Sequence, residues 1–184
     1  KEDILSMTKK EQRHLLKTKI QLFENKGQAS LEIAKKLINL PEYQNSKSVF
    51  VYLSLDHEVN TDIIIKNAFK ERKKVYVPII EKNGKMYPSR VYPFSFYKKG
   101  SFGIREPVIK RIAKYPPDIA VIPLLGFDKE KNRLGRGGGY YDRFLKDFRG
   151  AVIALAFSCQ RLDNIENESH DIRPQIIITE DKVF

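Results

Sequence analysis

The feature that most restricts the fold is a series of short apolar runs, each about the length of a β-strand. They lie at residues 49–53, 75–79, 119–124, 152–157 and 176–178. Continuous apolar runs of this length are typical of strands that are buried on both faces, as in a parallel sheet. Helical patterns separate several of the runs, so we predict an α/β fold in which helices cover both faces of a mostly parallel sheet.

Helix and hairpin signals accompany these runs. Thr8 and Glu11 have the spacing of a capping box. The helix predicted from this box carries an apolar side made of Leu15, Leu16, Ile20 and Phe23. A second helix, which should end before Pro41, carries Leu31, Ala34, Leu37 and Ile38. A third follows the polar turn at 56–60 and carries Ile64, Ala68 and Phe69. Residues 85–92 alternate with period two, which predicts an antiparallel edge strand or hairpin.

The chain is basic, with a net charge of +11 at pH 7 and a pI of about 9.6. Such a charge attracts nucleic acid, membrane surfaces or small polyanions. The basic residues are scattered without a sustained tract, and no motif for binding DNA or RNA accompanies them. We therefore expect small anionic molecules, and not nucleic acid, as partners.

Length and cysteine content restrict the organisation further. The 184 residues, of which 41% are apolar, are expected to form one domain over residues 1–184. Cys159 is the one cysteine in the sequence, which excludes an internal disulfide and a multi-cysteine zinc site. We expect it to be a small buried side chain and not a nucleophile. The sequence shows no cleavable apolar leader and no long apolar run, so we expect a cytoplasmic protein without membrane contact. We further expect a monomer or weak homodimer.

The segment from Arg133 to Asp142 reads RLGRGGGYYD and lies between a predicted strand and a helix predicted over residues 140–148. Glycine lets backbone N–H groups approach an anion closely, and the two arginines add fixed positive charge. Free N–H groups in the first turn of the helix would point at the same anion. The pattern indicates a nucleotide-phosphate site, and a plain glycine-rich surface turn is the alternative.

The loop matches neither GxxxxGK[ST] nor GxGxxG. It resembles the signature of the 5-formyltetrahydrofolate cyclo-ligase family, in which an RLGRGxGYYD loop follows a strand that ends in proline, here Pro123. Further stretches resemble the family in the same order: KxxxR from Lys9 to Arg13, YLSLDHEVNT at 52–61, GSFGIREP at 100–107, AFSCQ at 156–160 and HDIRPQIII at 170–178. The resemblance extends over nearly the whole chain.

The resemblance implies a three-layer, Rossmann-like fold and an ATP- and magnesium-dependent reaction. In that reaction 5-formyltetrahydrofolate is closed to 5,10-methenyltetrahydrofolate, and ADP and phosphate are released. The γ-phosphoryl group goes to the formyl oxygen, and N10 then attacks the activated carbon. The protein must mainly supply positioning and charge neutralisation.

The resemblance also assigns residues to three overlapping groups. The ATP-binding group is Lys9, Arg13, Arg133, Leu134, Gly135, Arg136, Gly137, Gly138, Gly139, Tyr140 and Tyr141. The folate-binding group is Leu55, Glu58, Asn60, Arg136, Gly137, Gly138, Gly139 and Tyr140, of which Arg136, Tyr140 and Asn60 are expected to be catalytic. The magnesium ligands are Asp142 and Asp171, whose hard oxygens suit this ion.

Several of these residues also have ordinary structural interpretations. Lys9 and Arg13 are one helical turn apart and face one way, but most such pairs in basic helices are only solvated. Tyr140 and Tyr141 could pack at the start of the helix, or one of them could stack on the pterin or adenine. Asp142 could cap the helix.

The chain departs from the family pattern at Asn60, where an acid is usual. Asparagine keeps the hydrogen bonding but not the charge, and Glu58 is a nearby acid that could share the role. The departure leaves open a non-catalytic nucleotide- or anion-binding protein on the same scaffold.

The three histidines do not favour another chemistry. A sugar-phosphate isomerase or small-molecule kinase would need a general base, and neither His57 nor His170 has a supporting carboxylate at a suitable spacing. With His14, they form no HxH or HxxxH pair, so a transition metal is not expected. His170 is expected to be a loop hydrogen-bonder.

Topology predicts where the polar segments meet. In an open α/β sheet, ligands bind beyond the carboxyl ends of the strands. Polar segments follow three of the predicted strands, at residues 56–60, 133–142 and 160–161. Another strand ends near Pro78, and residues 170–171 come just before the last strand. We expect these segments to converge on one site.

Overall fold

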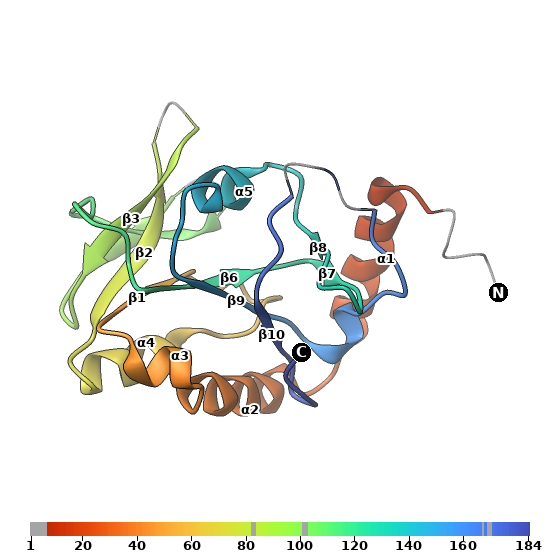
Figure 1. Ribbon diagram of the computed structural model, residues 1–184, viewed down its shortest axis with the longest axis horizontal. Coiled ribbons are helices and arrows are strands. Elements are labelled where there is room, and N and C mark those ends of the chain that lie inside the picture. The colour runs from red at the N-terminus through yellow and green to blue at the C-terminus, as the bar shows by residue number, and fades with distance from the viewer. Residues whose placement is uncertain (1–6, 82–83, 101–102, 167, 169–170) are drawn as a thin grey trace.

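The computed structural model describes residues 7–81, 84–100, 103–166, 168 and 171–184. Its centre is a six-stranded sheet with the strand order β10-β9-β6-β1-β2-β3 (Figure 1). Neighbouring strands are parallel except β3, which is antiparallel to β2. The strands are β1 Ser48–Val51, β2 Lys74–Ile80, β3 Met86–Val91, β6 Ile119–Pro123, β9 Ala151–Leu155 and β10 Ile176–Ile178. Each predicted apolar run therefore contributes a strand, and β3 is the predicted antiparallel edge.

Helices cover both faces of this sheet, as predicted. On one face lie α2 Lys26–Ile38, α3 Pro41–Asn45 and α4 Asp62–Lys70, and on the other lies α5 Tyr140–Leu145 (Figure 1). Successive side chains of a strand point to opposite faces. Val49 and Val51 of β1 therefore belong to the apolar cluster that includes α2 and α4, whereas Phe50 belongs to the cluster that includes α5. None of the described helices combines the length and apolar character needed to cross a bilayer.

Two details of the predicted helices that cover the sheet were wrong. Leu31 is 38% exposed, because the side of α2 that faces the sheet is formed by Ile33, Ala34 and Leu37. α5 ends at Leu145 and does not reach Phe148, since the chain then turns into β9. The predicted apolar side of this helix is nevertheless confirmed, because its members all pack in the second cluster: Tyr141, Phe144, Leu145 and Phe148.

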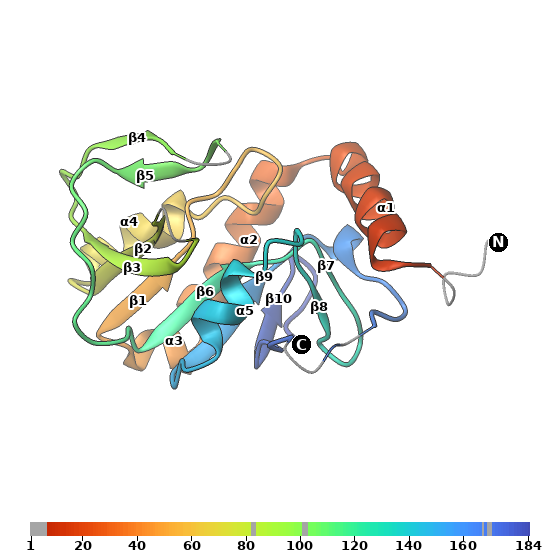
Figure 2. The same ribbon diagram turned by 90° about the horizontal axis from the view of Figure 1, so that it is seen from above.

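α1 Lys9–Leu22 lies to one side of the sheet, next to the loops that follow β6 (Figure 2). Its capping box is formed, because the Thr8 hydroxyl accepts a hydrogen bond from the Glu11 N–H and the Glu11 carboxylate accepts one from the Thr8 N–H at 2.8 Å. Leu15, Leu16 and Ile20 of its apolar side pack in a third cluster, whose buried members are Leu16, Ile20, Leu125, Leu134, Leu162 and Ile165. Phe23, which was also predicted for this side, follows the last helical residue and stacks on Phe157 of the first cluster. This cluster fixes α1 beside a small hairpin of β7 Gly126–Phe127 and β8 Arg133–Leu134.

Several short elements were not predicted. Besides α3, β7 and β8, they are β4 Tyr97–Lys99, β5 Arg105–Pro107 and the 3-10 turn η3 Ser158–Gln160. These elements have two to five residues each, which is too short for a hydrophobic period to show.

The strand order changes direction at β1. From β1 the chain passes through α4 to β2 and β3 on one side, and it later returns to place β6, β9 and β10 on the other side. The loops that leave the carboxyl ends of β1 and β6 therefore diverge. Such a switch point is where open α/β sheets bind ligands.

The amino ends of the same two strands are tied together by Asp118 and Ser48. The Asp118 carboxylate accepts hydrogen bonds from the backbone N–H of Lys47 at 2.7 Å and of Ser48 at 2.8 Å. The Ser48 hydroxyl in turn accepts one from the Asp118 N–H at 2.9 Å. Burial alone would raise the pKa of Asp118, but these hydrogen bonds outweigh it and hold the pKa below its ordinary value of 3.8.

We predict that Asp118→Ala lowers the free energy of unfolding at pH 7 by about 1 kcal/mol, because two backbone donors lose their charged acceptor but water can replace it at this exposed position. Since the pKa is lower in the folded state, this contribution is present above the ordinary value of 3.8 and is lost as the pH falls through the folded-state pKa. Urea unfolding at neutral and acid pH measures the effect, with the exposed Asp147→Ala as the control. A stability difference from the wild type that stays constant into acid would contradict this account.

Candidate active site

A cavity of about 500 Å³ lies at the switch point between β1 and β6. Its walls come from the ends of β1, β2 and β6, from α1, and from the glycine-rich loop before α5. A volume of this size is typical of small-molecule sites. The polar segments that follow β1, β2 and β6 therefore meet at one cavity, as predicted, and Asp171 also lines it.

The glycine-rich loop forms one wall of the cavity. Every residue from Arg133 to Asp142 lines it. Gly137 and Gly139 have φ angles of 103° and 63°, in the left-handed region that favours glycine. These two positions provide the unusual backbone conformation that the sequence predicted, and the loop is anchored by β8 at one end and α5 at the other.

Lys9 and Arg13 both reach the cavity from the first turns of α1, so the prediction that they face one way is confirmed. The Lys9 ammonium contacts Glu168 at 2.5 Å and Asp171 at 3.1 Å. Burial acts to lower the pKa of Lys9, but these two acids outweigh it and raise the pKa. The Arg13 Nε donates a hydrogen bond to the carbonyl of Gly135 at 3.0 Å, which joins α1 to the loop.

Arg133 and Asp142 form a buried ion pair across the base of the loop. The Arg133 side chain is 4% exposed, and its guanidinium donates to Oδ1 of Asp142 at 2.5 Å. The same oxygen accepts a hydrogen bond from the N–H of Ile172 at 3.1 Å. Asp142 therefore links the loop to the segment that leads into β10.

Arg136 and Glu58 connect the loop to the segment after β1. Arg136 donates to Glu58 at 2.7 Å and also contacts the ring of His57. The second oxygen of Glu58 accepts from the N–H of Leu55 at 2.8 Å. Partial burial and the neighbouring charge of Arg136 lower the pKa of His57, which favours the neutral ring.

The two loop tyrosines have different environments. Tyr141 packs against the cores on both faces of the sheet, and burial, with the charge of Glu58, raises its pKa well above the ordinary value. Tyr140 is half-buried, lines the cavity and carries the guanidinium of Arg143 over its ring at 5.1 Å. Of the two, Tyr140 is the better placed to contact a ligand.

Charge pairing divides the cations of the cavity into two kinds. Three of them contact a carboxylate within 4.0 Å, namely Lys9, Arg133 and Arg136. No carboxylate of the described residues forms an ion pair with Arg13. Arg13 therefore has the charge that is most available to an anionic ligand.

Some predicted residues do not line the cavity. Asn60 is exposed, and its Oδ1 accepts a hydrogen bond from the N–H of Asp62 at 2.8 Å, because α4 starts directly after it. Gln160 is buried and donates to the carbonyls of Leu124 and Leu125, so its role is to hold the turn after β6. Arg161 stacks on Phe184.

Two further predictions concern single side chains. Cys159 is half-buried between the first and third clusters, and burial raises the pKa of its thiol to about 11, as expected for a side chain that is not a nucleophile. His170, which the sequence predicted to be a loop hydrogen-bonder, lies outside the described residues.

The structure adds cavity residues that the sequence did not single out. Two are acids, Glu106 and Glu168, and the others are apolar, among them Ile80, Met86 and Ile104. Glu106 belongs to the GSFGIREP stretch, but it lies in the three-residue strand β5, so no period indicated which way it points. A search for acids within family-like stretches would have found it.

Comparison with known proteins agrees with these observations. The model of the 5-formyltetrahydrofolate cyclo-ligase family matches residues 6–180. The 5-formyltetrahydrofolate cyclo-ligase of Haemophilus influenzae is 34% identical over 153 residues, which cover 79% of this chain and 82% of that protein. The enzyme of the same name from Mus musculus is 32% identical over 176 residues, which cover 86% and 85%.

Solved structures show the same fold. The NMR structure of the 5,10-methenyltetrahydrofolate synthetase of Aquifex aeolicus has a TM-score of 0.84 and 33% identity, and covers 96% of this chain and 92% of that chain. The synthetase of Mycoplasma pneumoniae, at a TM-score of 0.73 and 22% identity, covers 95% and 99% and shares the fold. The fold and the family predicted from the sequence are confirmed, and with them the prediction of an enzyme. The chain belongs to the 5-formyltetrahydrofolate cyclo-ligase family.

Proposed function

We propose that the chain converts 5-formyltetrahydrofolate to 5,10-methenyltetrahydrofolate with ATP as co-substrate and magnesium as cofactor, releasing ADP and phosphate. The observation that carries this proposal is the cavity at the switch point. It is lined by the whole glycine-rich loop and by Arg13, which has no carboxylate partner among the described residues. A site of this kind suits an anionic ligand such as a nucleotide phosphate.

The formyl group is a poor electrophile and must be activated before N10 can attack it. In the proposed reaction the formyl oxygen attacks the γ-phosphorus and the bond to ADP breaks. N10 then attacks the formyl carbon, phosphate departs with the former formyl oxygen, and N10 loses its proton. The protein must hold the two substrates in line and neutralise the charge on the transferred group.

The phosphate groups are proposed to lie between Arg13 and the loop. The Arg13 guanidinium is fixed by its bond to Gly135 and lies beside Gly137, where a Cβ would be 3.7 Å from its Cζ. Backbone groups from Gly135 to Gly139 are therefore next to a cation that no carboxylate of the described residues neutralises. We propose that Lys9, held by two acids, and Arg133, held by one, add positive potential to the same end of the cavity.

The residues present fit a magnesium ion at this end. Asp142 and Asp171 both line the cavity. Oδ1 of Asp142 is occupied by Arg133 and Ile172, but Oδ2 accepts no hydrogen bond from a described residue, so this oxygen is available to a cation. Magnesium usually takes one or two carboxylates together with substrate phosphates. When bound, it would neutralise charge on the phosphate oxygens.

The reduced folate is proposed to fill the rest of the cavity, against Leu55, Glu58 and Tyr140. Arg136 is 47% exposed and is oriented by Glu58, so it can face charge that develops on the transferred group. The predicted catalytic and folate-binding role of Asn60 would require its side chain to release the N–H of Asp62. Glu58 is the acid of that segment that already lines the cavity.

A non-catalytic nucleotide- or anion-binding protein is the second candidate, and the departure from the family pattern at Asn60 is the observation that favours it. Because Asn60 does not line the cavity, replacing an acid there leaves the described lining intact. We therefore favour the enzyme.

We predict that the purified protein, given 5-formyltetrahydrofolate and Mg-ATP, forms the absorbing methenyl product together with an equal amount of ADP. Chelation of magnesium should abolish both products, because the phosphate charge is then left without its metal. Absorbance and nucleotide chromatography measure them in one reaction. Binding of ATP and folate without either product, or ADP without the methenyl product, would favour the non-catalytic candidate.

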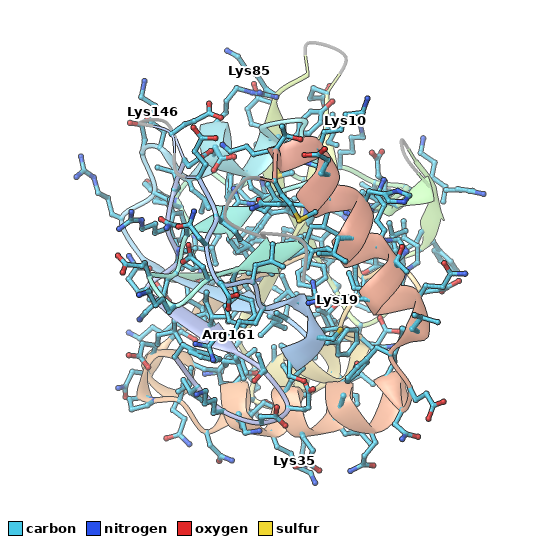
Figure 3. The ribbon with its side chains drawn as sticks, turned by 90° about the vertical axis from the view of Figure 1, so that its right-hand side faces the viewer. Lys10, Lys19, Lys35, Lys85, Lys146 and Arg161 are labelled. Atoms are coloured by element: carbon cyan, nitrogen blue, oxygen red, sulfur yellow. The ribbon has the colours of Figure 1, made fainter. Side chains whose placement is uncertain are left out.

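We predict that Arg13→Ala weakens ATP binding by about tenfold to a hundredfold, as expected for loss of a charged hydrogen-bond donor. Binding of 5-formyltetrahydrofolate should be almost unchanged, since Arg13 lies at the phosphate end. Lys10→Ala is the matched control, because Lys10 is exposed, points away from the molecule on the same helical turn and carries the same charge (Figure 3). Equal losses of ATP affinity in the two variants, or a loss of folate affinity in Arg13→Ala, would contradict the assignment.

A further inference from the structure

Glu106 is an acid of the cavity to which the proposed reaction gives no role. It lies in β5, which pairs with β4 and packs near β2. The residue is 8% exposed and lines the cavity. A Cβ at Gly100 would lie 2.5 Å from its Cδ, so the backbone of Gly100 packs directly on the carboxyl group and fixes its position.

Glu106 differs from the other acids of the cavity in its partners. Each of the others contacts a lysine or arginine, and these acids are Glu58, Asp142, Glu168 and Asp171. No hydrogen bond or ion pair joins the side chain of Glu106 to another described residue. The carboxylate oxygens of Glu106 are not enclosed by protein atoms, although the residue as a whole is buried, so a ligand in the cavity can supply their hydrogen-bond donors in place of water.

The position of Glu106 defines a second end of the cavity. α1, which carries Arg13, and β5, which carries Glu106, lie on opposite sides of the molecule (Figure 2). Ile104, in the segment directly before β5, also lines the cavity. One end therefore offers Arg13, which has no carboxylate partner among the described residues, and the other offers the acid Glu106 beside an apolar side chain.

We propose that Glu106 binds the hydrogen-bond donor edge of the pterin ring and so orients the folate. This inference rests on the proposed function and specifies how its substrate lies. The pyrimidine part of a reduced pterin carries a ring N–H and an amino group side by side, which match the two oxygens of one carboxylate. N5, which carries the formyl group, belongs to the other ring and would then point toward the phosphate end.

The test compares 5-formyltetrahydrofolate with its 2-desamino-2-methyl analogue, which lacks the amino donor. Calorimetry without nucleotide gives both affinities for the wild type, Glu106→Ala and the control Asp62→Ala. Asp62 pairs with Arg105, next to Glu106, but does not line the cavity. The wild type and the control should bind the analogue about tenfold to a hundredfold more weakly than the natural compound, because a buried acceptor is left unpaired.

In Glu106→Ala, which removes both acceptor oxygens, we expect this preference to be lost, with 5-formyltetrahydrofolate bound about tenfold to a hundredfold more weakly and ATP affinity unchanged. Equal affinity of the wild type for the two folates would overturn the inference, and so would a preference that persists in Glu106→Ala. If that variant does not fold, the comparison of the two folates in the wild type still tests whether the site recognises the amino group of the pterin.

The outcomes also separate this inference from the proposed function. A wild type that forms methenyl product but does not distinguish the two folates contradicts the role of Glu106 alone. A wild type that binds and distinguishes them but forms no product contradicts the proposed function. A wild type that binds neither folate contradicts both.

Discussion

The parallel pairing of β1 with both β2 and β6 is the constraint on which the rest of the structure depends. Because the strand order changes direction at β1, the loops after β1 and β6 diverge and the crevice between them arises from backbone topology. The bonds between Asp118 and Ser48 close the amino ends of this strand pair. The carboxyl ends are left to carry the residues that line the cavity.

Charges in that cavity are arranged before a ligand binds. The buried pair of Arg133 and Asp142 fixes the base of the loop, and the contacts of Lys9 with Glu168 and Asp171 fix the segment opposite it. Long side chains that are already held lose less conformational entropy when a ligand arrives, and their dipoles and charges need little reorganisation. Two groups remain without a charged partner among the described residues, Arg13 at one end and Glu106 at the other.

Much of this arrangement could be predicted from the sequence, because the informative patterns are local. Apolar runs predicted the strands, the capping box at Thr8 predicted the start of α1, and the glycine-rich loop predicted a wall of the site. What could not be predicted depends on contacts between distant segments. The hairpin that carries Glu106 is too short to show a period, and the bond from Asp62 that turns Asn60 away from the cavity forms only when α4 begins. A motif that resembles the family identifies residues that are close in sequence, but it does not show which of their side chains line the same cavity.

The fate of the formyl oxygen tests most directly whether one cavity brings ATP and a formylated folate together for phosphoryl transfer. 5-Formyltetrahydrofolate labelled with oxygen-18 in the formyl group would be converted with unlabelled Mg-ATP in unlabelled water, and the released phosphate analysed by mass spectrometry. The account predicts that the phosphate carries the label in an amount equal to the methenyl product. Unlabelled phosphate, with the label found in water, would contradict it, because the carbon–oxygen bond would then have broken without phosphorylation.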